Sequence, residues 1–248
     1  MALDLHRMDF IKKKIREVPV SKKWVIPKHV AITMDGIALW AEREKKSLEE
    51  AYRLSFQRMI ELFRLQVKHS IPITTVFLMP QSTLEGENFS TFVDLLEETF
   101  TSISGLDFIH KHKIKISVIG KWYDLPGRVV ESIRTLINET KDYDYFFFNF
   151  CINYSGQEEI VDACKLIARK IKADKLDPES INKETIKENL YTSYFLAPDI
   201  IIKTGLKSEL NGFLLWDSCQ SSIYFSRVLW PDFDQGFFAR ALDEFQHM

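Results

Sequence analysis

The hydrophobic and polar positions along the chain follow two patterns that alternate with each other. Short apolar runs predict buried strands of the parallel-sheet type at 30–33, 73–79, 114–120, 146–154 and 199–205. Longer segments with apolar residues every three to four positions predict helices at 48–69, 89–112, 126–141, 157–171 and 232–248. Residues 213–225 comprise an apolar segment followed by a predicted sixth strand at an edge of the sheet. We therefore predict one α/β domain with a central, mostly parallel β-sheet of about six strands flanked by helices.

The two ends of this pattern differ in character. Residues 1–24 are predicted to form an N-terminal amphipathic helix and a connector, with Leu5, Met8, Ile11 and Ile15 on one face. This helix either packs on the domain or lies on a membrane surface. The predicted domain covers 25–248, and 172–185 is its most loop-like part.

Composition and charge narrow the classes of protein. The chain has 248 residues, of which 46% are hydrophobic, and this is typical of a globular protein. A net charge of −2 without a basic stripe argues against a nucleic-acid partner. Three widely spaced cysteines predict neither a disulfide framework nor a zinc site, so we expect a cytoplasmic protein. The N-terminus is too charged for a signal peptide, and no apolar run is long enough to span a membrane.

The segment HVAITMDGIALW (29–40) carries the first candidate for chemistry, because Asp35 directly follows a predicted strand. Ligands of parallel sheets bind outside the carboxyl ends of strands. Asp35 is either the N-cap of the next helix or an acid at a site. With Mg²⁺ it would bind a phosphate group, and the free backbone N–H groups of a helix that starts at Gly36 would assist.

Several segments, in order along the chain, resemble motifs of one family. They are HVAITMDG with Trp40-Ala41, IGKWYDLPGRV (119–129), INYSGQEEIVDA (152–163), APDIIIKTG (197–205) and FLLWDSCQSSIYFSRVLWPDFD (213–234). This order resembles the cis-prenyltransferases, or undecaprenyl diphosphate synthase family. The resemblance implies a fold with a hydrophobic tunnel and usually a homodimer. It also implies Mg²⁺-dependent extension of an allylic diphosphate with isopentenyl diphosphate.

The chain departs from the family pattern at positions that bind diphosphate. Ile37 and Leu39 replace an Asn and an Arg, and Tyr52 replaces a His. In the segment 203–211, Lys203 and Glu209 replace two Arg residues and Asn211 replaces a Ser; Ser222 stands where the family has a second Mg²⁺ carboxylate. The loss of bidentate Arg contacts, and the reversed charge of Glu209 if it faces the pocket, weaken the case for ordinary isopentenyl diphosphate binding.

The resemblance assigns roles to individual residues. Asp35 is the Mg²⁺ ligand and a catalytic residue. Tyr52 is a second catalytic candidate, because a Tyr here resembles the noncanonical branch of lavandulyl-type diphosphate synthases and terpene synthases of this fold. The diphosphate-binding candidates are Gly36, Ile37, Ala38, Leu39, Arg43, Lys203 and Asn211. Asp217, Glu85 and Glu87 are candidates for the missing second metal ligand.

We therefore predict a noncanonical prenyl-diphosphate enzyme that ionises an allylic isoprenyl diphosphate with Asp35 and Mg²⁺. The reaction would be an irregular prenyl transfer or a terpene-synthase-like conversion. Two alternatives stay open. One is a non-catalytic partner of a full-motif paralogue in a heteromeric cis-prenyltransferase, and the other is an isoprenoid-lipid-binding protein.

Overall fold

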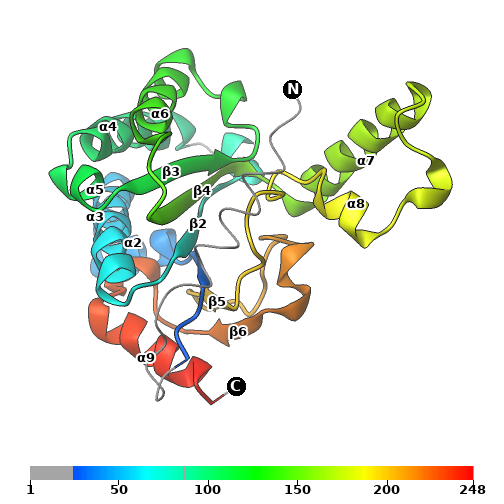
Figure 1. The fold of residues 1–248 in the computed structure, drawn as a ribbon. Coiled ribbons are helices and arrows are strands. Elements are labelled where there is room, and N and C mark those ends of the chain that lie inside the picture. Colours follow the sequence, from blue (N-terminus) through cyan, green and yellow to red (C-terminus); the bar gives the residue numbers. More distant parts are fainter. Residues whose placement is uncertain (1–24, 86–87, 248) are drawn as a thin grey trace.

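The computed structural model describes residues 25–85 and 88–247. The predicted N-terminal amphipathic helix lies outside these residues. The described part forms one α/β unit in which helices pack on a single sheet (Figure 1).

Six strands build the sheet, and every strand pair in it is parallel. They are β1 (His29–Thr33), β2 (Ile73–Pro80), β3 (Ile114–Ile119), β4 (Phe146–Tyr154), β5 (Ile200–Lys203) and β6 (Ser222–Phe225). The strand order is β3-β4-β2-β1-β5-β6, with β6 at an edge. In the register, Ile32 of β1 lies between Val76 of β2 and Ile202 of β5. The predicted fold class and the edge strand are confirmed.

Helices connect the strands and cover the sheet. They are α2 (Ile37–Glu44), α3 (Leu48–Lys68), α4 (Phe89–Ser104), α5 (Asp107–Lys111), α6 (Gly127–Thr140), α7 (Gly156–Lys172), α8 (Lys183–Lys187) and α9 (Gln235–Phe245). The start of α3 is set by a capping box. The side chain of Ser47 accepts a hydrogen bond from the backbone N–H of Glu50, whose carboxylate accepts the N–H of Ser47 in return.

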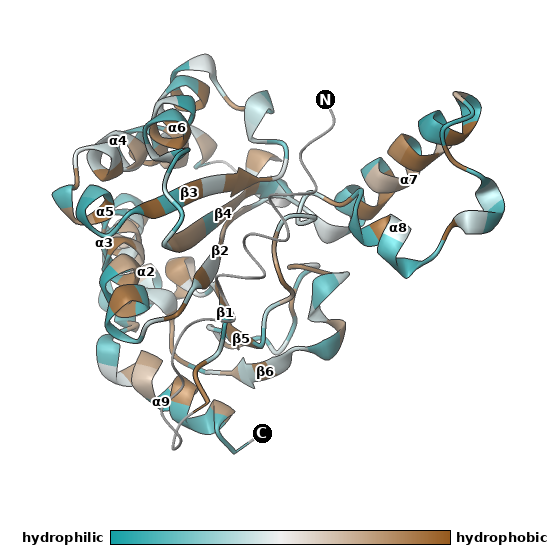
Figure 2. Cartoon of the chain, in the orientation of Figure 1, coloured by the Kyte–Doolittle hydropathy of each residue, from teal (hydrophilic) through white to brown (hydrophobic). Residues whose placement is uncertain are grey.

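The main core lies on one face of the sheet. Val30 and Ile32 of β1 and Phe148 of β4 pack there against apolar side chains of α3, α4, α6 and α9. Figure 1 shows these four helices on the same side of the sheet, and Figure 2 shows hydrophobic residues concentrated on the strands. Because successive strand residues point to opposite faces, Ala31 of β1 belongs to a second, smaller apolar cluster with Phe77 and Phe213.

Three predicted boundaries were wrong. The helix predicted at 89–112 is two helices, because the chain turns at Gly105 and Leu106. The segment 172–185, predicted as a loop, contains the start of α8, where Asn182 forms a capping box with Thr185. The terminal helix begins at Gln235 rather than at 232, because the side chain of Asp234 caps it by accepting the N–H of Phe237.

Two further observations concern the surface. The helix α7 and the segment that leads to α8 extend away from the sheet, on the opposite side from α3 and α4 (Figure 1). Within the described residues, no helix is both long and apolar enough to cross a membrane.

Candidate active site

A pocket of about 670 Å³ opens at the carboxyl ends of β1, β2 and β4. Its apolar wall comes from the ends of these three strands and from α3 and α4. Polar groups come from Gln81, Thr83, Ser155 and Asn211. The lining residues are Met34, Asp35, Gly36, Ile37, Tyr52, Phe77, Leu78, Pro80, Gln81, Thr83, Phe92, Tyr154, Ser155 and Asn211. An apolar pocket with a few polar groups at strand ends is the usual form of a small-molecule site.

Asp35 lies at one end of this pocket, directly after β1. Its carboxylate Oδ2 is 2.9 Å from the ammonium of Lys203, the last residue of β5. Its backbone is held by neighbours on both sides: its N–H donates to Thr204 Oγ1 and its carbonyl accepts the N–H of Trp230. β1 and β5 are neighbours in the sheet, so Lys203 and Thr204, which lie about 170 positions away in the chain, hold Asp35 in place.

Asp35 does not cap the helix that follows. The N-cap of α2 is Gly36, with φ of 92°, and no side chain accepts a hydrogen bond from the first turn. This left-handed conformation favours glycine, and a Cβ at position 36 would lie 2.7 Å from Leu229 Cδ2. The structure therefore argues against the N-cap interpretation of Asp35, and its role as an acid at a site stays a prediction.

The first turn of α2 provides backbone donors at the same end of the pocket. The N–H groups of Ile37, Ala38 and Leu39 have no acceptor among the described residues, as is normal for a first turn that no side chain caps. The turn contains no acidic residue. A helix N-terminus of this kind favours an anion.

Glycine also shapes the floor beneath Asp35. Gly205, which follows Lys203-Thr204, has φ of 89°. A Cβ at this position would lie 2.9 Å from Asp35 Cβ. The backbone of Gly205 therefore packs directly against Asp35, and a larger residue at position 205 would displace the Asp35 side chain.

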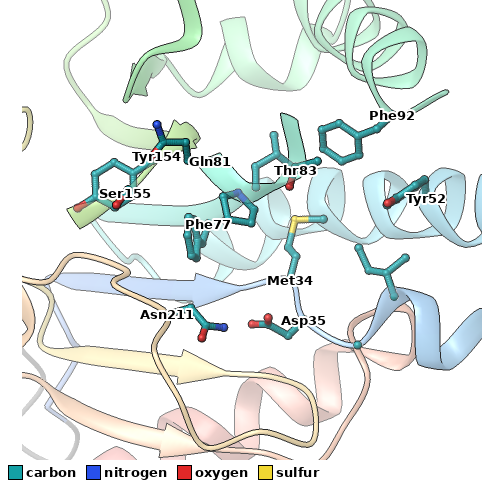
Figure 3. A pocket seen from close by; sticks show the side chains of 14 residues that line it. Met34, Asp35, Tyr52, Phe77, Gln81, Thr83, Phe92, Tyr154, Ser155 and Asn211 are labelled. Carbon is teal, nitrogen blue, oxygen red and sulfur yellow. The ribbon is translucent and has the colours of Figure 1, made fainter. Parts of the chain in front are cut away.

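The sequence-predicted site residues divide into three groups. Asp35, Gly36, Ile37, Tyr52 and Asn211 line the pocket, and Figure 3 shows the side chains of Asp35 and Asn211 turned toward each other. Ala38 and Leu39 have exposed side chains outside the pocket and can contribute only their backbone N–H groups. Lys203 lies below Asp35 rather than in the lining.

Arg43, like Lys203, belongs to the third group, whose side chains do not line the pocket. Its guanidinium pairs with Asp232 and with Glu44, each at 2.7 Å. These carboxylates raise the pKa of Arg43, mainly through the hydrogen bond to Asp232. Glu209 is exposed and does not line the pocket, so its negative charge does not face the Asp35 end.

The far end of the pocket is aromatic. The ring of Tyr52 meets that of Phe92 edge-on, with centroids 5.2 Å apart (Figure 3). The hydroxyl of Tyr52 has no hydrogen-bond partner among the described residues. Burial raises the pKa of Tyr52, so this hydroxyl stays protonated at neutral pH.

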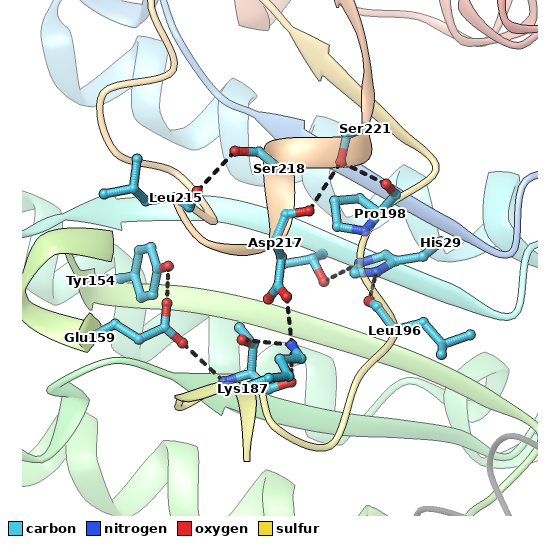
Figure 4. Close-up of polar contacts among 12 residues, drawn as sticks. His29, Tyr154, Glu159, Lys187, Leu196, Pro198, Leu215, Asp217, Ser218 and Ser221 are labelled. Carbon is cyan, nitrogen blue, oxygen red and sulfur yellow. Dashed lines mark hydrogen bonds and ion pairs between the residues drawn. The ribbon is translucent and has the colours of Figure 1, made fainter. Parts of the chain in front are cut away.

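Tyr154 joins the pocket wall to a buried polar network on the second face of the sheet. Its hydroxyl donates to Glu159 at 2.5 Å, and the other carboxylate oxygen of Glu159 accepts the N–H of Thr192 (Figure 4). Burial raises the pKa of Glu159, and the hydrogen bonds from Tyr154 and Thr192 act in the opposite direction. Asp217 is 2.7 Å from Lys187 in the same network and does not line the pocket.

The described residues that line the pocket offer a divalent metal a single carboxylate, that of Asp35. Asp35 Oδ1 accepts no hydrogen bond from the described residues, and no cluster of three or more His, Cys, Asp or Glu side chains occurs among them. Ser222 lies in β6, while Glu87 and the side chain of Glu85 lie outside the described parts. Since Mg²⁺ is commonly bound by one or two carboxylates plus phosphate oxygens of the substrate, Asp35 fits a metal shared with a diphosphate.

A parallel α/β sheet with an acid and a helix N-terminus beside an apolar pocket suits an anionic group attached to an apolar chain. The family model described as putative undecaprenyl diphosphate synthase matches residues 33–248. The chain belongs to this family of prenyl transferases.

Individual relatives agree with this assignment. The tritrans,polycis-undecaprenyl-diphosphate synthase (geranylgeranyl-diphosphate specific) of Methanocaldococcus jannaschii is 35% identical over 240 residues, which cover 95% of this chain and 85% of that protein. The isoprenyl transferase of Oceanobacillus iheyensis is 28% identical and covers 97% of this chain and 95% of its own.

A solved structure shows the same fold. Lavandulyl diphosphate synthase from Lavandula x intermedia, in complex with dimethylallyl diphosphate, superposes with a TM-score of 0.84. The match covers 90% of this chain and 96% of that chain at 22% identity.

Sequence reasoning missed much of the pocket wall. Phe77, Tyr154 and Ser155 lie at or just beyond the ends of β2 and β4, which the strand pattern did predict. Their position at the carboxyl ends of parallel strands was the available signal. The pairing of Thr204 and Trp230 with the Asp35 backbone had no such signal, because it depends on how distant segments fold together.

Proposed function

We propose that the chain is a noncanonical prenyl-diphosphate enzyme that ionises an allylic isoprenyl diphosphate. The product would come from irregular prenyl transfer or from a terpene-synthase-like reaction. One observation carries this proposal: the Asp35 carboxylate and the unpaired N–H groups of α2 stand together at one end of an apolar pocket. The diphosphate would lie at that end and the isoprenoid chain along Met34, Tyr52 and Phe92.

Each part of the pocket has a task in this reaction. The backbone N–H groups of Ile37, Ala38 and Leu39 would donate to diphosphate oxygens, where negative charge grows as the C–O bond breaks. Asp35 would hold Mg²⁺ against the same oxygens, and this metal supplies charge neutralisation for the leaving diphosphate. The apolar wall would exclude water from the allylic cation.

The polar end of the pocket argues against ordinary chain elongation. No Lys, Arg or His side chain of the described residues lines the pocket. Regular elongation places a second diphosphate, that of isopentenyl diphosphate, in the same cavity as the first. Holding two such groups without cationic side chains is unfavourable, because their charges repel each other at short range.

A product screen tests the proposal. The purified chain with Mg²⁺ should convert at least one of dimethylallyl, geranyl, farnesyl and geranylgeranyl diphosphate when isopentenyl diphosphate is absent. Turnover of none of them, with or without isopentenyl diphosphate, would refute it. A regular cis-polyprenyl product would show instead that the altered positions still support elongation.

A second candidate function rests on the missing cations. Asp35 is the one charged side chain among the described residues of the pocket, and it already pairs with Lys203. Such a pocket also suits an isoprenoid that binds without reacting, either in a lipid-binding protein or in a non-catalytic partner subunit. Binding of a prenyl alcohol without turnover of any diphosphate supports this candidate. Co-purification with a full-motif paralogue, and activity of the pair alone, would identify the partner subunit.

Tyr52 is proposed as a catalytic residue that acts through its ring. Among the described residues its hydroxyl has no partner to relay a proton, whereas its ring faces the pocket and can stabilise a cation. Tyr52→Phe should keep turnover within about threefold, and Tyr52→Leu should lower it on the order of tenfold. Steady-state kinetics on both variants separates the roles, since a proton relay would make Tyr52→Phe as damaging as Tyr52→Leu.

The family's usual assembly leads us to propose a homodimer. We propose α7 as the contact surface, because this helix extends away from the sheet and carries the exposed apolar side chains of Val161 and Leu166. A buried charge without a partner is costly, so Val161→Glu should shift the mass measured by light scattering from dimer to monomer. Gln157→Glu, an exposed change on the same helix, serves as the control. A wild-type monomer, or a dimer unchanged by Val161→Glu, would contradict the proposal.

A further inference from the structure

Lys203 is placed differently from a residue that binds substrate. It is 1% exposed, and its ammonium donates to the carbonyl of Thr204 at 2.8 Å while lying 2.9 Å from Asp35 Oδ2. It does not line the pocket. To reach a diphosphate in the pocket it would have to leave both of these partners.

The pair changes the electrostatics of the pocket before any ligand arrives. The positive charge of Lys203 balances the negative charge of Asp35, so this end of the empty pocket carries little net charge. A divalent cation that approaches the open Oδ1 meets the ammonium beside the other oxygen and is repelled by it. Among the described residues that line the pocket, no second carboxylate offsets this repulsion.

We propose that Lys203 is a positioning residue that acts as the internal counter-ion of Asp35. It keeps divalent metal off Asp35 while the pocket is empty and admits the metal only together with a diphosphate, whose negative charges outweigh the ammonium. This inference rests on the proposed function in so far as the ligand is a diphosphate. In this proposal Lys203 interacts with the carboxylate of Asp35 and not with the substrate.

The test measures metal binding without turnover. Mn²⁺ replaces Mg²⁺, and its binding to the ligand-free protein is followed by electron paramagnetic resonance. Wild type should bind Mn²⁺ weakly, and Lys203→Met should bind it more tightly by on the order of tenfold or more, because a neighbouring positive charge has been removed. Lys203→Gln, which keeps polar contacts but not the charge, should show the same gain and serves if the Met variant folds poorly.

Two controls locate the gain at Asp35. The double variant Asp35→Asn/Lys203→Met should lose it, and Lys187→Met, which breaks the Lys187–Asp217 pair outside the pocket, should not show it. Inorganic pyrophosphate added to wild type should raise Mn²⁺ binding above that of the same solution without protein.

Any of four results would overturn the inference: wild type binding Mn²⁺ as tightly as Lys203→Met, a gain that survives Asp35→Asn, a gain in Lys187→Met, or no effect of pyrophosphate on wild type. The metal-only measurements use no prenyl substrate. They can therefore succeed when every allylic diphosphate fails in the product screen, and they can fail when turnover is found.

Discussion

Asp35→Ala is expected to abolish turnover and also to destabilise the fold. Turnover should fall by a factor on the order of 100 or more, because the leaving diphosphate loses its metal ligand. The substitution also leaves the ammonium of Lys203 buried, with the Thr204 carbonyl as its remaining hydrogen-bond partner. Orphaning a fully buried charge costs about 3–5 kcal/mol, and since the side chain of Asp35 is 35% exposed we expect roughly 2 kcal/mol here.

Asp35→Ala therefore changes two quantities at once, turnover and the free energy of unfolding. Loss of activity in Asp35→Ala alone does not distinguish a missing ligand from a disturbed fold. Asp35→Asn/Lys203→Met removes both charges and should recover stability to within about 1 kcal/mol of wild type, without recovering turnover. Chemical denaturation measures the first quantity and the product assay the second. An Asp35→Ala protein as stable and as active as wild type would remove Asp35 from the site.

Acidification is expected to destabilise the protein through His29, at the start of β1. This side chain is 3% exposed, and burial lowers its pKa from 6.5 to about 4. Because Leu196 O can only accept, His29 Nδ1 carries the proton and donates to it at 2.6 Å. His29 Nε2 then accepts from the hydroxyl of Thr75 at 2.7 Å (Figure 4). The hydroxyl of Thr75 in turn accepts from Asn149 Nδ2, so the chain of hydrogen bonds suits a neutral imidazole.

The direction of the pH effect follows from the lowered pKa. Between pH 6.5 and about 4 the unfolded chain binds a proton at His29 that the folded chain does not, so the free energy of unfolding falls as pH falls through this window. A shift of this size corresponds to roughly 3 kcal/mol, fully present above pH 6.5. Nearby Asp199 and Asp217 favour the charged form and Lys187 opposes it, and burial outweighs them.

His29→Gln isolates this contribution. The variant keeps hydrogen-bonding groups and should be less stable than wild type at neutral pH. Because Gln does not titrate, the variant should lose less stability on acidification. The difference between the two unfolding free energies should narrow from pH 7 to pH 4, and other titrating groups, including Glu159, cancel in it. Parallel slopes for wild type and His29→Gln would contradict the assignment.

The candidate site shows where sequence reasoning succeeds. Asp35 was identified because it follows a strand of a parallel sheet, and the structure places it in the pocket with Gly36, Ile37, Tyr52 and Asn211. Position at a strand end is a local property, since it depends on where an apolar run stops. The same holds for the capping box of Ser47 and Glu50, whose two members are three residues apart.

The residues that sequence reasoning placed less well share another property. Arg43 and Lys203 are both cations that were predicted to bind diphosphate, yet the first pairs with Asp232 and the second pairs with Asp35 itself. Whether a cation faces a pocket depends on which carboxylate it pairs with, and here Asp232 and Asp35 come from segments distant in the sequence. The break at Gly105 was missed for a related reason: the apolar spacing continues into α5 although the backbone turns.

The sequence by itself determined the alternation of strands and helices, the parallel character of the sheet, the family and the position of Asp35 at the end of β1. These depend on the spacing of apolar residues and on short motifs, which act over one or two turns or one strand. The tertiary structure alone decided the strand order, the closeness of Gly205 to Asp35, and the pairing of Lys203, predicted to bind diphosphate, with the carboxylate of Asp35. The last two are contacts at the ends of β1 and β5, which lie about 170 residues apart in the chain. No local pattern encodes which side chains meet when such strands become neighbours.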